Sequence, residues 1–115
     1  MEDLRKELAR LKDLNERQFN GFKSNFYVVK AALRYYSENQ GLSFNASRLA
    51  DEFPLSVPAA GSSLKMLSEL GVIEPRNDSG SADRYMPRDV DLGRLLKVEE
   101  VLVEQLEIEK FEKQG

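Results

Sequence analysis

The chain has 115 residues and a net charge of −3 at neutral pH, with 41% hydrophobic and 32% charged residues. This length and composition fit one folded domain with a modest core and exclude a disordered chain. The sequence contains no Cys and no His, which excludes disulfides, thiolate metal sites and catalytic centres that need an imidazole base. We therefore expect no catalytic residue, no metal ligand and no cofactor, and we do not expect an enzyme.

The chain carries no signal for a membrane or for secretion. No apolar run approaches the length of a membrane span, and the charged residues 1–11 lack the apolar core of a secretion signal. We therefore expect a soluble protein of the cytoplasm without membrane contact.

A stripe of apolar and amide side chains predicts a helix over residues 2–19. Its members recur at spacings of four and three residues, as in the seam of a coiled coil, where a buried Asn15 would fix the register. We favour a contact with a second chain over packing on the rest of the same domain. The residues expected at this contact are Leu4, Leu8, Leu11 and Asn15.

The middle of the chain predicts three further helices. A break or kink at Asn20-Gly21 precedes the first of them, because glycine costs about 1 kcal/mol relative to alanine inside a helix. The other two follow Asn45 and Ser56, whose side chains can accept a hydrogen bond at a helix start. The predicted helices cover residues 24–39, 46–53 and 57–70.

The last third of the chain predicts a short hairpin and a long helix. Residues 72–74 and 84–86 favour two antiparallel strands, which neighbouring prolines keep short. The helix over residues 92–112 is apolar around more than half of its circumference, and one small domain rarely covers so wide a face. We therefore expect a second chain to contact Leu95, Leu102 and Leu106.

This order of elements resembles the winged helix-turn-helix fold. The resemblance is carried by Ala46-Ser47-Arg48-Leu49-Ala50-Asp51-Glu52-Phe53, by the helix from Ser56 to Leu70 and by Gly71-Val72-Ile73-Glu74. Residues 64–74 are similar to the LxxLxxLGxIE ending of many bacterial and archaeal regulators, and the long flanking helices resemble dimeric regulators of the MarR and PadR type.

The resemblance implies a mainly α fold with a small β-wing, that is, a winged helix-turn-helix with long N- and C-terminal dimerisation helices. Residues 24–90 would form the winged domain, and residues 1–23 and 91–115 would form dimer contacts. In this fold the second helix of the motif enters the major groove of DNA. We therefore expect a homodimer that binds double-stranded DNA and regulates transcription.

The resemblance also implies which residues contact DNA. The helix over 57–70 would face inward through Val57, Ala60, Leu64 and Leu67, and the wing would span residues 74–86. The residues expected to contact DNA are Arg48, Ser56, Pro58, Ala59, Ser62, Ser63, Lys65, Met66, Arg76, Asn77, Ser79 and Arg84. No Arg, Asn or Gln lies on the expected outward face of that helix, so we expect modest sequence specificity.

The charge balance supports an alternative. Residues 41–91 hold five basic and eight acidic residues, and Lys65 is the only cation on the helix over 57–70. A winged helix can also serve as a protein–protein interaction module or as a subunit of a larger assembly, without DNA binding of its own. Arg76 and Arg84 would then pair with Asp78 and Asp83. A pocket for a small-molecule effector, between the flanking helices and the winged domain, is a further alternative.

Overall fold

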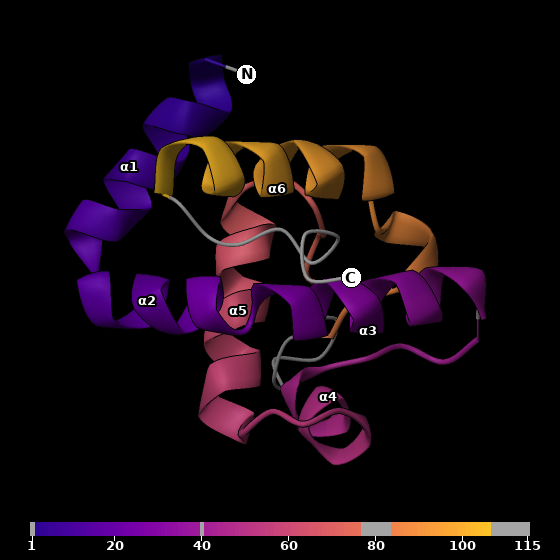
Figure 1. Ribbon diagram of the computed structural model, residues 1–115. Helices are drawn as coiled ribbons and strands as arrows, with labels where there is room; N and C mark the ends of the chain where they lie inside the picture. Colours follow the sequence, from indigo (N-terminus) through magenta and orange to yellow (C-terminus); the bar gives the residue numbers. More distant parts are fainter. Residues whose placement is uncertain (1, 40, 77–83, 107–115) are drawn as a thin grey trace, which may run out of the picture.

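The computed structural model describes residues 2–39, 41–76 and 84–106, which form six α-helices and one short 3-10 helix (Figure 1). The expectation of a mainly α fold is confirmed. No described helix is long and apolar enough to cross a bilayer. In chain order the elements are α1 (Glu2–Leu14), α2 (Glu16–Ser24), α3 (Phe26–Glu38), α4 (Ala46–Glu52), α5 (Val57–Glu69), η1 (Pro87–Asp89) and α6 (Leu92–Leu106).

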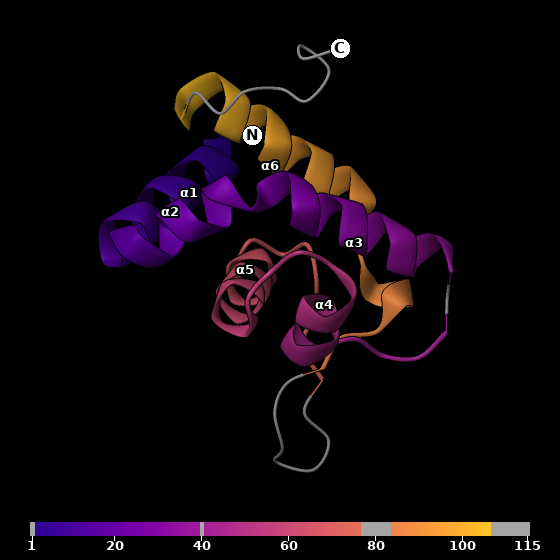
Figure 2. The same cartoon turned by 60° about the horizontal axis from the view of Figure 1, so that its bottom comes forward.

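The helices are arranged around α2 and α3, which follow one another across the middle of the molecule (Figure 2). Helix α6 lies on one side of this pair, and α4 and α5 lie on the other. Helix α1 packs on α2 and α6, whereas α5 packs on α2, α3 and α4. An ion pair of 2.7 Å between Lys30 and the almost fully buried Glu99 joins α3 to α6. The α4–α5 pair therefore packs on one side of α2 and α3, opposite α6.

The N-terminal helix ends earlier than expected. Asn15 is not a residue of a seam, because it starts α2: its side chain accepts a hydrogen bond of 3.1 Å from the backbone N–H of Gln18. The break predicted at Asn20-Gly21 is also wrong, since Gly21 lies inside α2. The break comes at Asn25, whose backbone and side-chain N–H groups both donate to the carbonyl of Gly21.

The apolar stripes predicted at dimer contacts pack within one chain. They belong to a single core and each of their own side chains is at most 3% exposed, so they pack on the same domain, which was the alternative. The prediction that a second chain covers these stripes rested on their being exposed in one chain, and they are buried there. The residues concerned are Leu4, Leu8, Leu11, Leu95 and Leu102. The side chain of Leu106 and the predicted helix beyond it lie outside the described residues.

The described part of the predicted wing contains one antiparallel bridge and no strand. Arg76 and Arg84 exchange backbone hydrogen bonds of 2.7 and 3.2 Å. The predicted pairing of residues 72–74 with 84–86 is wrong. The carbonyl of Val72 instead accepts from the N–H of Asp91, and Tyr85 pairs with Phe44. Proline at position 75 has no N–H to donate, so pairing starts after it.

Candidate nucleic-acid interface

Helices α4 and α5 are the two helices expected to form a helix-turn-helix, and both begin at the predicted caps. The side chain of Asn45 accepts a hydrogen bond of 2.9 Å from the N–H of Arg48, and Ser56 Oγ accepts one of 3.1 Å from Ala59. A Cβ atom built at Gly61 would lie 3.7 Å from the Cβ of Ala46. This distance is an ordinary van der Waals contact, so α4 and α5 lie close together here, and the two caps fix where each helix starts.

One face of α5 carries most of its exposed side chains. Successive residues of a helix are about 100° apart, so positions 57, 58, 61, 62 and 65 share one face. Along it, Val57, Pro58 and Lys65 are exposed, while Gly61 and Ser62 are half-buried. We call these five residues the outward stripe of α5. Its side chains are small except at the lysine, and the exposed Glu69, one turn after Lys65, continues the same face with a carboxylate.

The outward stripe differs from the predicted reading face. Ser63 is 0% exposed and Met66 is 4% exposed, so the prediction that both face DNA is wrong. Val57 was expected to face inward and is 51% exposed. Ala59 is half-buried. The cause is that α5 packs on α2 as well as on α3 and α4, which buries a wider and differently directed arc than the leucine stripe alone indicates.

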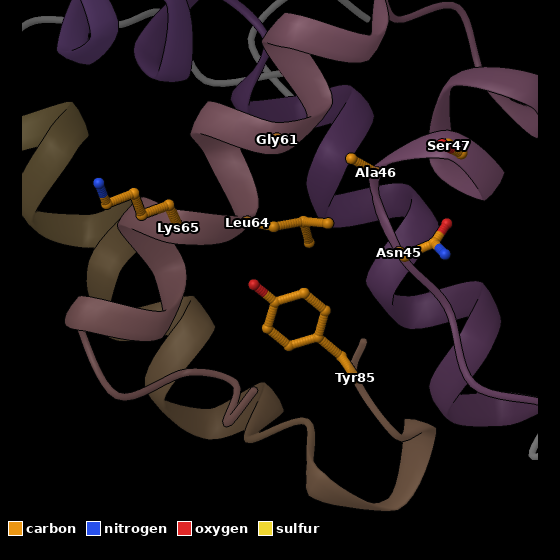
Figure 3. A pocket seen from close by; sticks show the side chains of 7 residues that line it. All are labelled: Asn45, Ala46, Ser47, Gly61, Leu64, Lys65 and Tyr85. Atoms are coloured by element: carbon orange, nitrogen blue, oxygen red, sulfur yellow. The ribbon is translucent and has the colours of Figure 1, made fainter. Parts of the chain in front are cut away.

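An open pocket of about 420 Å³ borders the outward stripe (Figure 3). Lys65 stands at one edge of it and Asn45 at the opposite edge, with the ring of Tyr85 and the side chain of Leu64 between them. The side chains that line it are Asn45, Ala46, Ser47, Gly61, Leu64, Lys65 and Tyr85. The pocket thus combines an apolar floor with polar groups and one ammonium group.

Sequence reasoning missed Tyr85 as a part of this site. Phe44 and Tyr85 exchange backbone hydrogen bonds of 2.9 and 2.8 Å, and Phe44 also stacks on Tyr36 with ring centroids 4.7 Å apart. This pairing brings together segments that lie far apart in the sequence, and no local pattern reveals it. The only local signal is Phe44 itself, an aromatic residue in the segment between α3 and α4.

Arg48 is not placed to contact DNA, because its guanidinium is engaged within the chain. Nη1 donates to the carbonyl of Ser43 at 2.9 Å, Nε donates to Glu52 Oε1 at 3.0 Å, and the group lies 4.9 Å from the centre of the Tyr36 ring. The side chain therefore connects α4 to α3 and to the segment before α4. The prediction of Arg48 as a phosphate ligand is wrong for this arrangement.

The two arginines of the predicted wing are in different situations. Nε of Arg76 donates to Asp89 Oδ2 at 2.9 Å, so the alternative of an ion pair holds, with a partner on η1. Arg84 is exposed. Asn77 and Ser79 lie outside the described residues, as do Asp78 and Asp83.

A second hollow of about 270 Å³ lies between α3 and α6. Its walls are leucines of α6, and the cationic side chains of Lys30 and Arg34 stand at its α3 side. Among the described residues, Lys30 pairs with Glu99. This hollow lies where an effector pocket would lie under the alternative stated above, and it is smaller than most pockets for small molecules.

Comparisons of this chain with protein-family models, curated proteins and solved structures found no match.

Proposed function

We propose that this protein binds double-stranded DNA as a transcription regulator, with α5 entering the major groove. The observation that carries the proposal is the outward stripe of α5, in which the described residues leave Val57, Pro58 and Lys65 exposed. A recognition helix contacts base edges through the outward residues of its N-terminal half. Positions 57, 58, 61 and 62 occupy that half of α5, and their small side chains let the helix axis approach the groove floor, while Lys65 follows just beyond it.

Lys65 and the neighbouring pocket supply contacts to the DNA backbone. Most hydrogen bonds between proteins and DNA go to phosphate and sugar groups, and they position the protein on the duplex. The pocket has the ammonium group of Lys65 at one edge and Asn45 and Ser47 at the opposite edge, and these groups can donate to phosphate oxygens. Ser56 uses its oxygen as the helix cap, and its hydroxyl proton can still donate to a phosphate.

One chain offers few cations to the proposed DNA interface, because Arg48 and Arg76 form ion pairs with Glu52 and Asp89 of the same chain. A single chain therefore neutralises few phosphates, and we expect weak binding by one copy. The dimer of our sequence-based prediction would double these contacts. Leu96 of α6 is 53% exposed, and it offers a second copy an apolar contact that the buried leucine stripes do not.

Binding to a random-sequence DNA duplex across a salt series tests the proposal. The affinity should fall linearly with salt on logarithmic axes, because each neutralised phosphate releases counterions. Lys65→Ala should weaken binding and reduce the slope by about 0.9 for each lysine lost at the interface. Lys97→Ala is the matched control, since Lys97 is also exposed but lies on α6, on the other side of the molecule.

The absence of binding at low salt would overturn the proposal, and so would equal effects of the two lysine substitutions. The second candidate function is a protein–protein interaction module. It is favoured by the internal use of Arg48 and Arg76 and by the exposed apolar side chain at position 57.

A further inference from the structure

We infer that Val57 gives the protein a preference for thymine, through contact of its side chain with the C5-methyl group of thymine in the major groove. The inference rests on the proposed DNA binding and names the base feature that the same site reads. It starts from the finding that Val57 is 51% exposed, where the leucine pattern predicted a buried side chain.

The first turn of α5 holds Val57 in a defined position. Ser56 caps the helix through its bond to the N–H of Ala59, and Pro58 occupies the first turn, where its ring fixes the backbone angle φ. A valine side chain has one strongly preferred rotamer in a helix. The side chain of Val57 is thus 51% exposed at the capped start of α5, and a β-branched side chain has little rotamer freedom to lose on binding.

The outward stripe offers a limited chemistry for reading bases. It contains no Arg, Asn or Gln, the side chains that make paired hydrogen bonds to guanine or adenine. At its N-terminal end, Val57 and Pro58 present only carbon atoms. The one apolar feature of the major groove is the thymine methyl group, which is absent from G·C pairs. Contact with that methyl group is therefore the base discrimination available to this end of α5.

The distance between Val57 and Lys65 along α5 is compatible with binding in the major groove of DNA. Lys65 lies eight residues after Val57, which corresponds to about 12 Å along the axis at 1.5 Å per residue. The major groove is about 12 Å wide. A helix with Val57 at the groove floor can thus hold Lys65 near a phosphate strand, with the carboxylate of Glu69 one turn further from the groove floor.

The test compares two synthetic duplex polymers that differ in the methyl group alone: alternating dA–dT and alternating dA–dU. Both are titrated with the wild-type protein and with Val57→Ala. The wild type should bind the uracil polymer about fourfold more weakly, the loss expected for one buried methyl group. Val57→Ala should bind the two polymers with similar affinity, so the methyl effect and the substitution should not add.

Each other result contradicts the inference. Equal binding of the wild type to both polymers would overturn it and leave DNA binding intact. An equal loss in the wild type and in Val57→Ala would place the methyl contact elsewhere on the protein. If neither polymer nor a random-sequence duplex binds, the proposed function fails and the inference fails with it. The unfolding midpoint of Val57→Ala should match the wild type, because the replaced side chain is exposed.

Discussion

The phenol of Tyr36 on α3 donates a hydrogen bond of 2.6 Å to Glu52 Oε1 on α4. Arg48 reaches the same oxygen from one helical turn earlier. Burial, followed by the contact with Glu52, raises the pKa of Tyr36 well above its ordinary value. The hydrogen bond from Tyr36 is the largest cause that lowers the pKa of Glu52. This contact holds α4 on α3, and α4 in turn packs on α5.

The Tyr36→Phe substitution tests the origin of the pKa shift at Glu52. Phenylalanine keeps the ring that stacks on Phe44 and removes the hydroxyl donor. The pKa of Glu52 should then rise toward its ordinary value of 4.5, as measured by NMR of the side-chain carboxyl carbon. Tyr35→Phe is the control, since the exposed Tyr35 makes no described hydrogen bond to Glu52. An unchanged pKa of Glu52 in Tyr36→Phe would contradict this assignment.

The same contact makes part of the stability dependent on pH. The pKa of Glu52 is lower in the folded state than in the unfolded state, so its ionised form favours folding. This contribution is complete above the unfolded value of about 4.5 and is lost as the pH falls through the lower folded value. The denaturation midpoint of the wild type should therefore fall between about pH 5 and about pH 3 more than that of Tyr36→Phe. Equal falls would contradict the prediction.

Substitution of two glycines by alanine should have opposite effects on stability. Gly71 has φ of +81°, and a Cβ there would lie 2.9 Å from Nε of Arg94, which donates to the carbonyl of Leu70. Gly71→Ala should lower the free energy of unfolding by about 1–2 kcal/mol. Gly21 lies inside α2 with nothing near its absent Cβ, so Gly21→Ala should raise the free energy by up to about 1 kcal/mol. Denaturant titrations measure both, and a stabilising Gly71→Ala would contradict the turn geometry.

The leucine side chains of α1 should stabilise a single chain, without a contribution from a second copy. Leu8 is 2% exposed, so Leu8→Ala should lower the free energy of unfolding by about 2–5 kcal/mol. Because the contact is within one chain, the loss should not depend on protein concentration. Leu14→Ala, at a side chain that is 68% exposed, should have little effect. A loss that shrinks as the protein concentration rises would instead support the coiled-coil seam.

The features that could be predicted from the sequence are local ones. Asn45, Ser56 and Asp91 each cap the helix that follows them by accepting from a backbone N–H three residues on, so a short stretch of sequence contains the whole interaction. Asn15 makes the same kind of bond, but its spacing from the leucines also fitted a seam. The choice between the two depended on what covers α1.

The features that could not be predicted depend on distant partners. The outward direction of Val57 and the burial of Met66 follow from the packing of α2 and α3 on α5. The engagement of Arg48 follows from Tyr36 and Ser43. A periodic pattern shows that a helix has a buried face, but it does not show how many neighbours cover that helix. Arg48 and Arg76 were therefore predicted to contact DNA, and the outward face of the helix was predicted at the wrong angle.

An NMR titration of the labelled protein with a random-sequence DNA duplex tests the central claim most directly. The backbone amide signals of Val57, Gly61, Ser62 and Lys65 should shift in proportion to the DNA added, together with Ser47 at the pocket. The signals of Leu96 and Lys97 on α6 should move less. Shifts confined to α6, or no shifts at low salt, would contradict the claim that α5 is the DNA-reading helix.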